Sequence, residues 1–211
     1  MKNKLIKLAI DVDDCICNTV EMDYACAYNL NKHNKKLCKD FDKDYFSVAK
    51  TFELSKQETY DFFMKEKQYI MKNCSMYPKV FVKEVLHLLR KHGAEIIITS
   101  SRDDVFWNGN AKKYLKAWLK KYKLEYDKIY CYGPIKKEEI CKQLNVDYLV
   151  EDNVESVTKA NKNKIKTFLI KTTYNADYKH KLNKFAENWL DLYEQICEIC
   201  NLKKEIDLFN H

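Results

Sequence analysis

Apolar residues in this chain form short continuous runs that alternate with longer stretches of helical periodicity. The short runs are rich in Ile, Val, Leu and Phe and predict buried strands at Leu5–Asp11, Ala94–Thr99, Lys128–Cys131, Asp147–Val150 and Lys166–Ile170. Apolar residues spaced by three and four predict helices at Val80–His92, Asn110–Tyr122, Lys137–Leu144, Val154–Asn161 and about Leu182–Cys200. Strands alternating with helices predict an α/β fold, a Rossmann-like parallel sheet with helices on both faces.

The stretch between the first and second predicted strands has a different character. From about Asn18 to Tyr77 the pattern is helical and contains neither Gly nor Pro, and the first breaker in the chain is Pro78. We therefore expect a catalytic core formed by residues 1–17 and 78–211, and a small all-helical cap, residues 18–77, inserted after the first strand.

Composition agrees with a single globular core carrying an insert. The chain has 211 residues, of which 46% are hydrophobic and 33% charged, which excludes a disordered or fibrous protein. No apolar run approaches the roughly 18–20 residues that a membrane span needs, and no signal peptide is indicated. The nine Cys then favour reduced thiols, so we expect a cytoplasmic protein without a membrane partner.

The excess positive charge of the chain is concentrated in one segment. The net charge is +7, and Lys159–Lys184 contains eight Lys against a single acid, Asp177. A nucleic-acid surface would also be expected to use Arg, of which the whole chain has only two. We interpret the segment as a solvated face, and nucleic-acid binding on the same fold stays as a lesser alternative.

Polar side chains follow four of the predicted strands. They are the groups Asp11-Val12-Asp13-Asp14, Thr99-Ser100-Ser101-Arg102, Lys136-Lys137 and Glu151-Asp152. Because ligands bind at the carboxyl ends of parallel strands, we expect these groups to converge on one edge of the sheet. Each group alone is a common loop or helix-cap feature. Together, carboxylates, hydroxyls and an ammonium suit a hard divalent cation and an anion such as phosphate.

These four groups resemble the motifs of the haloacid-dehalogenase-like (HAD) phosphohydrolases. The first motif of that family, hhhDxDx[TV], matches Leu8-Ala9-Ile10-Asp11-Val12-Asp13-Asp14-Cys15, with Cys in place of Thr or Val. The others are a strand ending in Thr or Ser, a Lys at a helix start, and a strand ending in an acid pair, here Glu-Asp where Asp-Asp is common. The helical insert, Trp118-Leu119 and Tyr126-Asp127-Lys128-Ile129 make the resemblance closest to the 5'(3')-deoxyribonucleotidase-like branch.

The resemblance implies a Mg²⁺-dependent phosphomonoester hydrolase. Asp11 would be the nucleophile that forms an aspartyl-phosphate, and Asp13 would be the general acid and base. Mg²⁺ would be held by Asp11, the main-chain carbonyl of Asp13, and Asp152. Thr99, the Ser100 amide and Lys137 would hold the phosphate.

Several assignments remain open at this point. Lys136 competes with Lys137 as the phosphate lysine, and Glu151 is a second candidate for metal ligation. Cys15 is interpreted as a buried small residue, since no His lies near it to activate a thiol nucleophile.

The insert bears on the substrate, which we expect to be a small-molecule phosphomonoester. Aromatic residues of the insert, among them Phe46, Phe52 and Phe63, could stack on a nucleobase or simply fill the core of the cap. A 5'-nucleotidase is the preferred interpretation and a phosphatase of another small metabolite, such as a sugar phosphate, is the alternative. We expect a monomer or a homodimer.

Overall fold

The computed structural model describes residues 6–31, 54–68, 72, 76–102, 109–133, 136–175 and 177–205. Its centre is a six-stranded sheet in the order β3-β2-β1-β4-β5-β6, in which every neighbouring pair is parallel. The strands are β1 Lys7–Ile10, β2 Glu95–Ser100, β3 Lys128–Cys131, β4 Tyr148–Glu151, β5 Lys166–Ile170 and β6 Asn183–Ala186. The predicted parallel α/β sheet is therefore confirmed.

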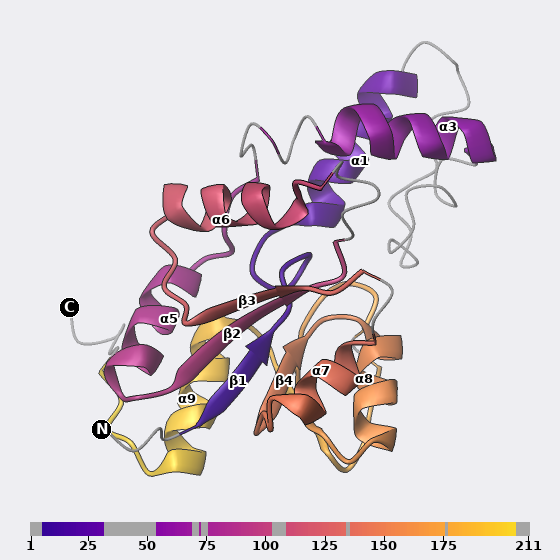
Figure 1. Ribbon diagram of the computed structural model, residues 1–211. Coiled ribbons are helices and arrows are strands. Elements are labelled where there is room, and N and C mark those ends of the chain that lie inside the picture. Colours follow the sequence, from indigo (N-terminus) through magenta and orange to yellow (C-terminus); the bar gives the residue numbers. More distant parts are fainter. Residues whose placement is uncertain are drawn as a thin grey trace.

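Helices cover both faces of the sheet (Figure 1). On one face, α5 (Val82–Lys91), α6 (Ala111–Lys121) and α9 (Trp189–Cys200) pack on alternate strand residues such as Leu8 and Ile10. On the other, α7 (Lys137–Gln143) and α8 (Val154–Lys162) pack around Ala9 and Leu149. Because successive strand residues point to opposite faces, continuous apolar runs are what a sheet covered on both faces requires.

The order of the strands creates a single switch point. From β1 the chain adds β2 and β3 on one side, and then β4, β5 and β6 on the other. The connections after β1 and β4 therefore run to opposite faces of the sheet, and this is the position at which open α/β sheets bind ligands. Asp11 follows β1, and Glu151 and Asp152 lie at the end of β4.

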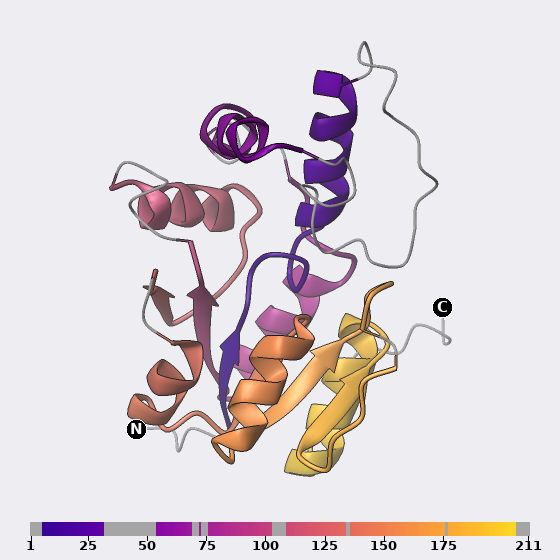
Figure 2. The ribbon, with the colours of Figure 1, turned by 90° about the vertical axis from the view of Figure 1, so that its right-hand side faces the viewer.

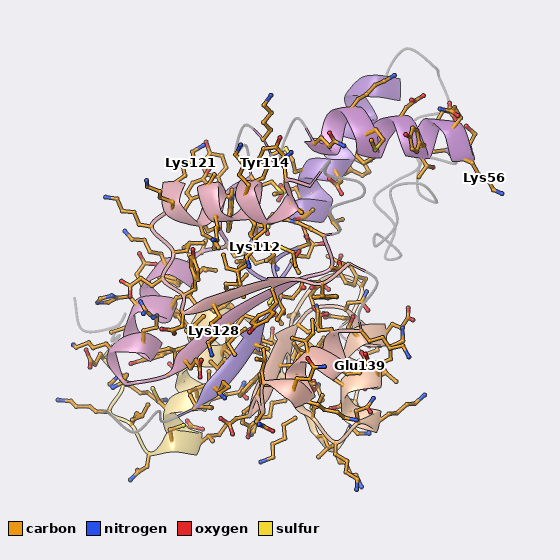
Figure 3. The ribbon with its side chains drawn as sticks, in the orientation of Figure 1. Lys56, Lys112, Tyr114, Lys121, Lys128 and Glu139 are labelled. Atoms are coloured by element: carbon orange, nitrogen blue, oxygen red, sulfur yellow. The ribbon has the colours of Figure 1, made fainter. Side chains whose placement is uncertain are left out.

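The helices of the insert lie beyond the carboxyl ends of the strands. In the described part of the insert they are α1 (Thr19–Asn31), α3 (Lys56–Asp61) and the π-helix η1 (Phe62–Lys67) (Figures 1 and 2). Ser55 and Glu58 form a reciprocal capping box that begins α3, and Lys56 lies at the end of that helix farthest from the sheet (Figure 3).

The chain leaves the core and returns to it at adjacent points. Cys17 forms an antiparallel bridge with Pro78, and the Lys79 amide donates to the Ile16 carbonyl at 2.9 Å. The division into a core and a cap at residues 17 and 78 stays a prediction, and this pairing is where such a division would place its hinge.

The sequence prediction was wrong at the start of the last helix. Instead of one helix from about Leu182 to Cys200, the chain forms the edge strand β6 and then α9. The Asn188 side chain accepts from the Leu190 and Asp191 amides at 2.9 and 3.0 Å, so the helix begins only at Trp189. Within α9, Cys197 is buried and Cys200 is half-buried.

The Lys-rich segment runs through α8, β5, the following loop and β6. All eight of its lysines are exposed, which agrees with a solvated face, and Lys159 and Lys171 form ion pairs with Glu155 and Glu187. Across the described residues, no helix combines the length and apolarity that a membrane crossing requires.

Candidate active site

The turn after β1 fixes the first two candidate carboxylates. The Asp11 amide donates to the Val150 carbonyl of β4, and the Val12 carbonyl accepts from the amides of Ile16 and Cys17. This tight turn requires a left-handed residue, which is Asp14 at φ 55°; Asp tolerates this conformation better than most side chains. Asp11 therefore lies at the strand end, and Asp13 follows within the turn.

Lys137 connects the strand ends of β1 and β4. It is the first residue of α7, and its buried ammonium lies 2.5 Å from Asp11 Oδ1 and 2.6 Å from Glu151 Oε1. Lys136 is the exposed N-cap residue of the same helix. Of the two lysines that the sequence left open, only Lys137 reaches the carboxylates.

The buried cluster carries more negative than positive charge. Asp11, Glu151 and Asp152 each place a carboxylate oxygen within 4.8 Å of the others. Among the described residues, Lys137 supplies the one ammonium that contacts this cluster, through Asp11 and Glu151. Burial and the Glu151 charge raise the pKa of Asp11 to about 8. Burial, Glu151 and Asp11 also raise the pKa of Asp152 well above its usual range.

This donor set fits a hard divalent cation. All three groups offer oxygen, which Mg²⁺ and Ca²⁺ prefer, and a cation would offset the repulsion that raises the carboxyl pKa values. The side-chain cluster includes Glu151, which the sequence analysis held as an open candidate ligand. Glu151 or the Asp13 carbonyl as the third ligand, and the preference for Mg²⁺, stay predictions.

Asp13 is engaged by a buried arginine. Arg102, just after β2, contacts Asp13 through Nη2 at 2.8 Å and Nε at 3.0 Å, and the Thr19 hydroxyl donates to Asp13 Oδ1 at 2.7 Å. The guanidinium is buried, and its Nη1 has no hydrogen-bond partner among the described residues. Arg102 had no predicted role, since an Arg after a strand carries no signal of its partner in the sequence.

The two phosphate-binding residues predicted at the end of β2 differ in the hydrogen bonds of their hydroxyls. The Thr99 hydroxyl donates to the Ile10 carbonyl at 3.2 Å, so its proton is already used. The Ser100 oxygen accepts from the Arg102 amide at 3.2 Å, which leaves its own proton available. Both residues are fully buried at the carboxyl end of the sheet.

A tyrosine that the sequence analysis did not single out completes the cluster. The Tyr174 hydroxyl, in the loop after β5, lies 2.5 Å from Asp152 Oδ2 and 3.2 Å from Asp14 Oδ2. The next residue, Asn175, donates to the main-chain carbonyl of Asp152 at 2.8 Å. The end of a fifth strand thus contributes to the site, although no polar motif in the sequence marked it.

The remaining candidates divide into described and undescribed residues. Cys15 is fully buried, and burial together with the Asp11 charge raises the pKa of its thiol, so it does not supply a thiolate. Phe63 lies in η1, whereas Phe46 and Phe52 lie outside the described residues. A contact between these aromatic residues and a substrate therefore stays a prediction.

The sequence of the chain is weakly similar to one curated protein. No protein-family model matches the chain. A protein named as a nucleotidase from Clostridium acetobutylicum is 23% identical over 188 residues, which are 89% of this chain and 92% of that protein.

Solved structures of other proteins share the fold of this chain over most of its length. A haloacid-dehalogenase-like hydrolase from Streptococcus pneumoniae has a TM-score of 0.65 at 13% identity, covering 90% of this chain and 98% of its own. A structure described as a predicted phosphoglycolate phosphatase from Haemophilus somnus has a TM-score of 0.62 at 14% identity, covering 93% of this chain and 100% of its own. The chain therefore has the fold of the HAD-like hydrolases, as the sequence predicted. The deoxyribonucleotidase-like branch stays a prediction.

Proposed function

We propose that this chain is a metal-dependent phosphomonoester hydrolase that uses Asp11 as its nucleophile. The observation that carries the proposal is the buried cluster of Asp11, Lys137, Glu151 and Asp152 at the switch point of the sheet. With Asp13 two residues after Asp11, the cluster offers a nucleophile, a proton donor, a cation-binding group and an ammonium for phosphate. Those are the groups that phosphoryl transfer to a carboxylate requires.

The reaction proceeds in two displacements at phosphorus. An Asp11 carboxylate oxygen attacks the phosphorus, the bond to the ester oxygen breaks, and Asp13 supplies the proton that the leaving oxygen needs. Water then attacks the phosphorus of the aspartyl-phosphate while Asp13 accepts its proton, and inorganic phosphate leaves with the Asp11 carboxylate restored. Asp13 must exchange part of its contact with Arg102 and Thr19 to reach the substrate.

The cation has one contribution in this scheme. Mg²⁺ held by Asp11 and Asp152, with Glu151 or the Asp13 carbonyl, would neutralise phosphate charge so that an anionic carboxylate can approach an anionic ester. Lys137, the first residue of α7, would also neutralise phosphate charge. Burial lowers the pKa of its ammonium, but the charges of Asp11 and Glu151 raise that pKa well above its usual range, so Lys137 stays charged.

Phosphate oxygens would be held by Lys137 and by the end of β2. The Ser100 hydroxyl has a proton to donate, and its amide is the second donor predicted there. Thr99 would contribute after its hydroxyl leaves the Ile10 carbonyl. Removing the Ser100 hydroxyl should therefore weaken phosphate binding more than removing that of Thr99.

For the substrate, we propose a nucleoside 5'-monophosphate. The support is the nucleotidase name of the Clostridium acetobutylicum relative, together with the aromatic composition of the insert. The alternative, another small phosphorylated metabolite such as a sugar phosphate, has support from the structural likeness to the protein described as a phosphoglycolate phosphatase.

A substrate panel with and without Mg²⁺ tests the proposal. We expect phosphate release from deoxynucleoside monophosphates and a generic aryl phosphate only with the metal, and a loss of about 10³-fold or more in Asp11→Asn. The exposed acid Asp177, on the loop after β5, gives the control Asp177→Asn, which should keep full activity. An active Asp11→Asn variant would refute the nucleophile, and equal rates on sugar phosphates would refute the nucleotide preference.

A further inference from the structure

Two neighbouring side chains of the loop between β5 and β6 contact Asp152 of the acidic cluster. Tyr174 contacts the Asp152 carboxylate at 2.5 Å, and Asn175 donates to the Asp152 carbonyl at 2.8 Å. The same Asn175 amide donates to the Ile170 carbonyl at 2.8 Å, and its oxygen accepts from the Thr172 amide at 2.9 Å. Asn175 is 2% exposed, so this anchor is shielded from competing water.

The anchor fixes where the phenol can lie. Because Asn175 holds the end of β5 and the backbone of Asp152 together, the preceding residue cannot move relative to Asp152 without breaking buried hydrogen bonds. The Tyr174 oxygen is therefore held against one particular oxygen of Asp152, Oδ2.

The phenol also connects this loop to the turn after β1. It lies 3.2 Å from Asp14 Oδ2, and the other oxygen of Asp14 accepts from the Val20 amide at 2.9 Å. Val20 belongs to the first turn of α1, the helix that leads into the insert. Tyr174 thus lies where the ends of β4 and β5 meet the turn that carries the nucleophile.

We propose that Tyr174 is a positioning residue that orients the Asp152 carboxylate for the metal ion. The proposal rests on the proposed function and deepens it. The phenol donates to Oδ2 and leaves Oδ1 of Asp152 for the cation. A neutral donor suits this task, because it fixes the rotation of the carboxylate without cancelling the negative charge that attracts the metal. Groups that orient metal ligands in this way typically change metal affinity by about 10–100-fold when removed.

Direct measurement of Mg²⁺ binding by calorimetry, without substrate, tests the proposal. Tyr174→Phe removes the hydroxyl and keeps the ring, and we expect its Kd for Mg²⁺ to rise about 10–100-fold. In turnover assays the Mg²⁺ concentration at half-maximal rate should rise by the same factor, while kcat at saturating Mg²⁺ changes much less. Purely structural damage would lower kcat and stability without this selective shift.

The chain offers a matched control on the same loop. The Tyr178 hydroxyl contacts Thr158 and Asn161 of α8, at 3.3 and 3.2 Å, and none of the cluster residues. Tyr178→Phe should therefore leave the Kd for Mg²⁺ unchanged. Urea unfolding of the metal-free variants checks that both are folded.

The outcomes separate this inference from the proposed function. An unchanged Kd in Tyr174→Phe, a wild-type protein that binds no Mg²⁺, or a variant that does not fold would each overturn the role of Tyr174. Weakened Mg²⁺ binding in a protein that hydrolyses no phosphomonoester would support the role of Tyr174 and refute the proposed function instead.

Discussion

Two aspartates separated by one residue lie in opposite electrostatic surroundings. Among the described residues, Asp11 faces Glu151 and Asp152 with the single ammonium of Lys137 in contact, whereas Asp13 forms a bidentate ion pair with Arg102. Removing the charge of Asp11 relieves repulsion among the buried carboxylates. Removing the charge of Asp13 leaves the buried Arg102 guanidinium without its partner. Substitution by Asn, which keeps the shape, should therefore change stability with opposite sign at the two positions.

For Asp11 the expected effect depends on pH. Burial and Glu151 raise the carboxyl pKa from 3.8 to about 8 in the folded protein, so between these values the folded state holds a proton that the unfolded state has lost. This contribution to stability is complete below pH 3.8 and is lost as the pH rises through 8. The slope is about 1.4 kcal/mol per pH unit for one proton. The free energy of unfolding of metal-free Asp11→Asn should therefore increase relative to wild type from pH 4 to pH 8.

Asp13→Asn is the matched comparison. The Arg102 guanidinium is 4% exposed and would keep its charge in the interior, so we expect a loss of about 3 kcal/mol in the free energy of unfolding. Urea unfolding of the three metal-free proteins at several pH values measures both effects. If Asp11→Asn were the less stable variant at pH 8, the account of the cluster would be wrong.

Candidate site residues that belong to ordered motifs were predictable from the sequence, and those that act through tertiary contacts were not. Asp11 and Asp152 follow strands, and Lys137 begins a helix. Their positions relative to the predicted strands were therefore enough to place them at one edge of the sheet. Arg102 and Tyr174 meet their carboxylate partners across 89 and 22 residues of chain, and no local pattern reports such a pair.

Among the elements, the buried strands were predictable and the edge strand was not. β2 and β4 are buried along their whole length, and their apolar runs are a strong local signal. β6 pairs only with β5 among the described residues and reads Asn-Lys-Phe-Ala, with Phe185, Ala186 and Trp189 spaced like a helical face. Its hydrogen bonds to β5 outweigh that weak local preference.

Helix α9 contacts the turn after β1. Trp189, 1% exposed, donates from Nε1 to the Cys15 carbonyl at 3.0 Å, within the turn that carries Asp13. Trp189→Phe should lower the free energy of unfolding by about 2 kcal/mol, since it leaves a buried carbonyl unpaired and a small cavity. It should also lower kcat, because the turn loses a restraint.

Trp118 provides a comparison of the same chemistry in α6. It is 1% exposed and donates to the Met76 carbonyl at 2.9 Å, outside the turn after β1. Trp118→Phe should cost similar stability with a smaller change in kcat, measured by urea unfolding and steady-state assays. Equal losses of kcat in the two variants would contradict a specific role for α9 in holding the turn.

For the molecule as a whole, the alternation of strands and helices was sufficient to predict the parallel sheet, except for β6, and the edge at which the candidate site residues lie. Parallel strands bring their carboxyl ends together whatever the detail of each loop, so four separated motifs could be placed side by side. Whether the insert contacts a substrate was not predictable in the same way. Aromatic residues at helical spacing fill a core or contact a ligand equally well, and Phe46 and Phe52 lie outside the described part of the chain.

The central claim is that the Asp11 carboxylate becomes phosphorylated during turnover. Reaction with a phosphomonoester, rapid acid quenching and borohydride reduction convert an aspartyl-phosphate to homoserine, which peptide mass spectrometry locates in the sequence. We predict homoserine at position 11, dependent on both substrate and Mg²⁺ and absent from Asp11→Asn. Turnover that leaves position 11 unmodified, or that modifies another residue instead, would contradict the account.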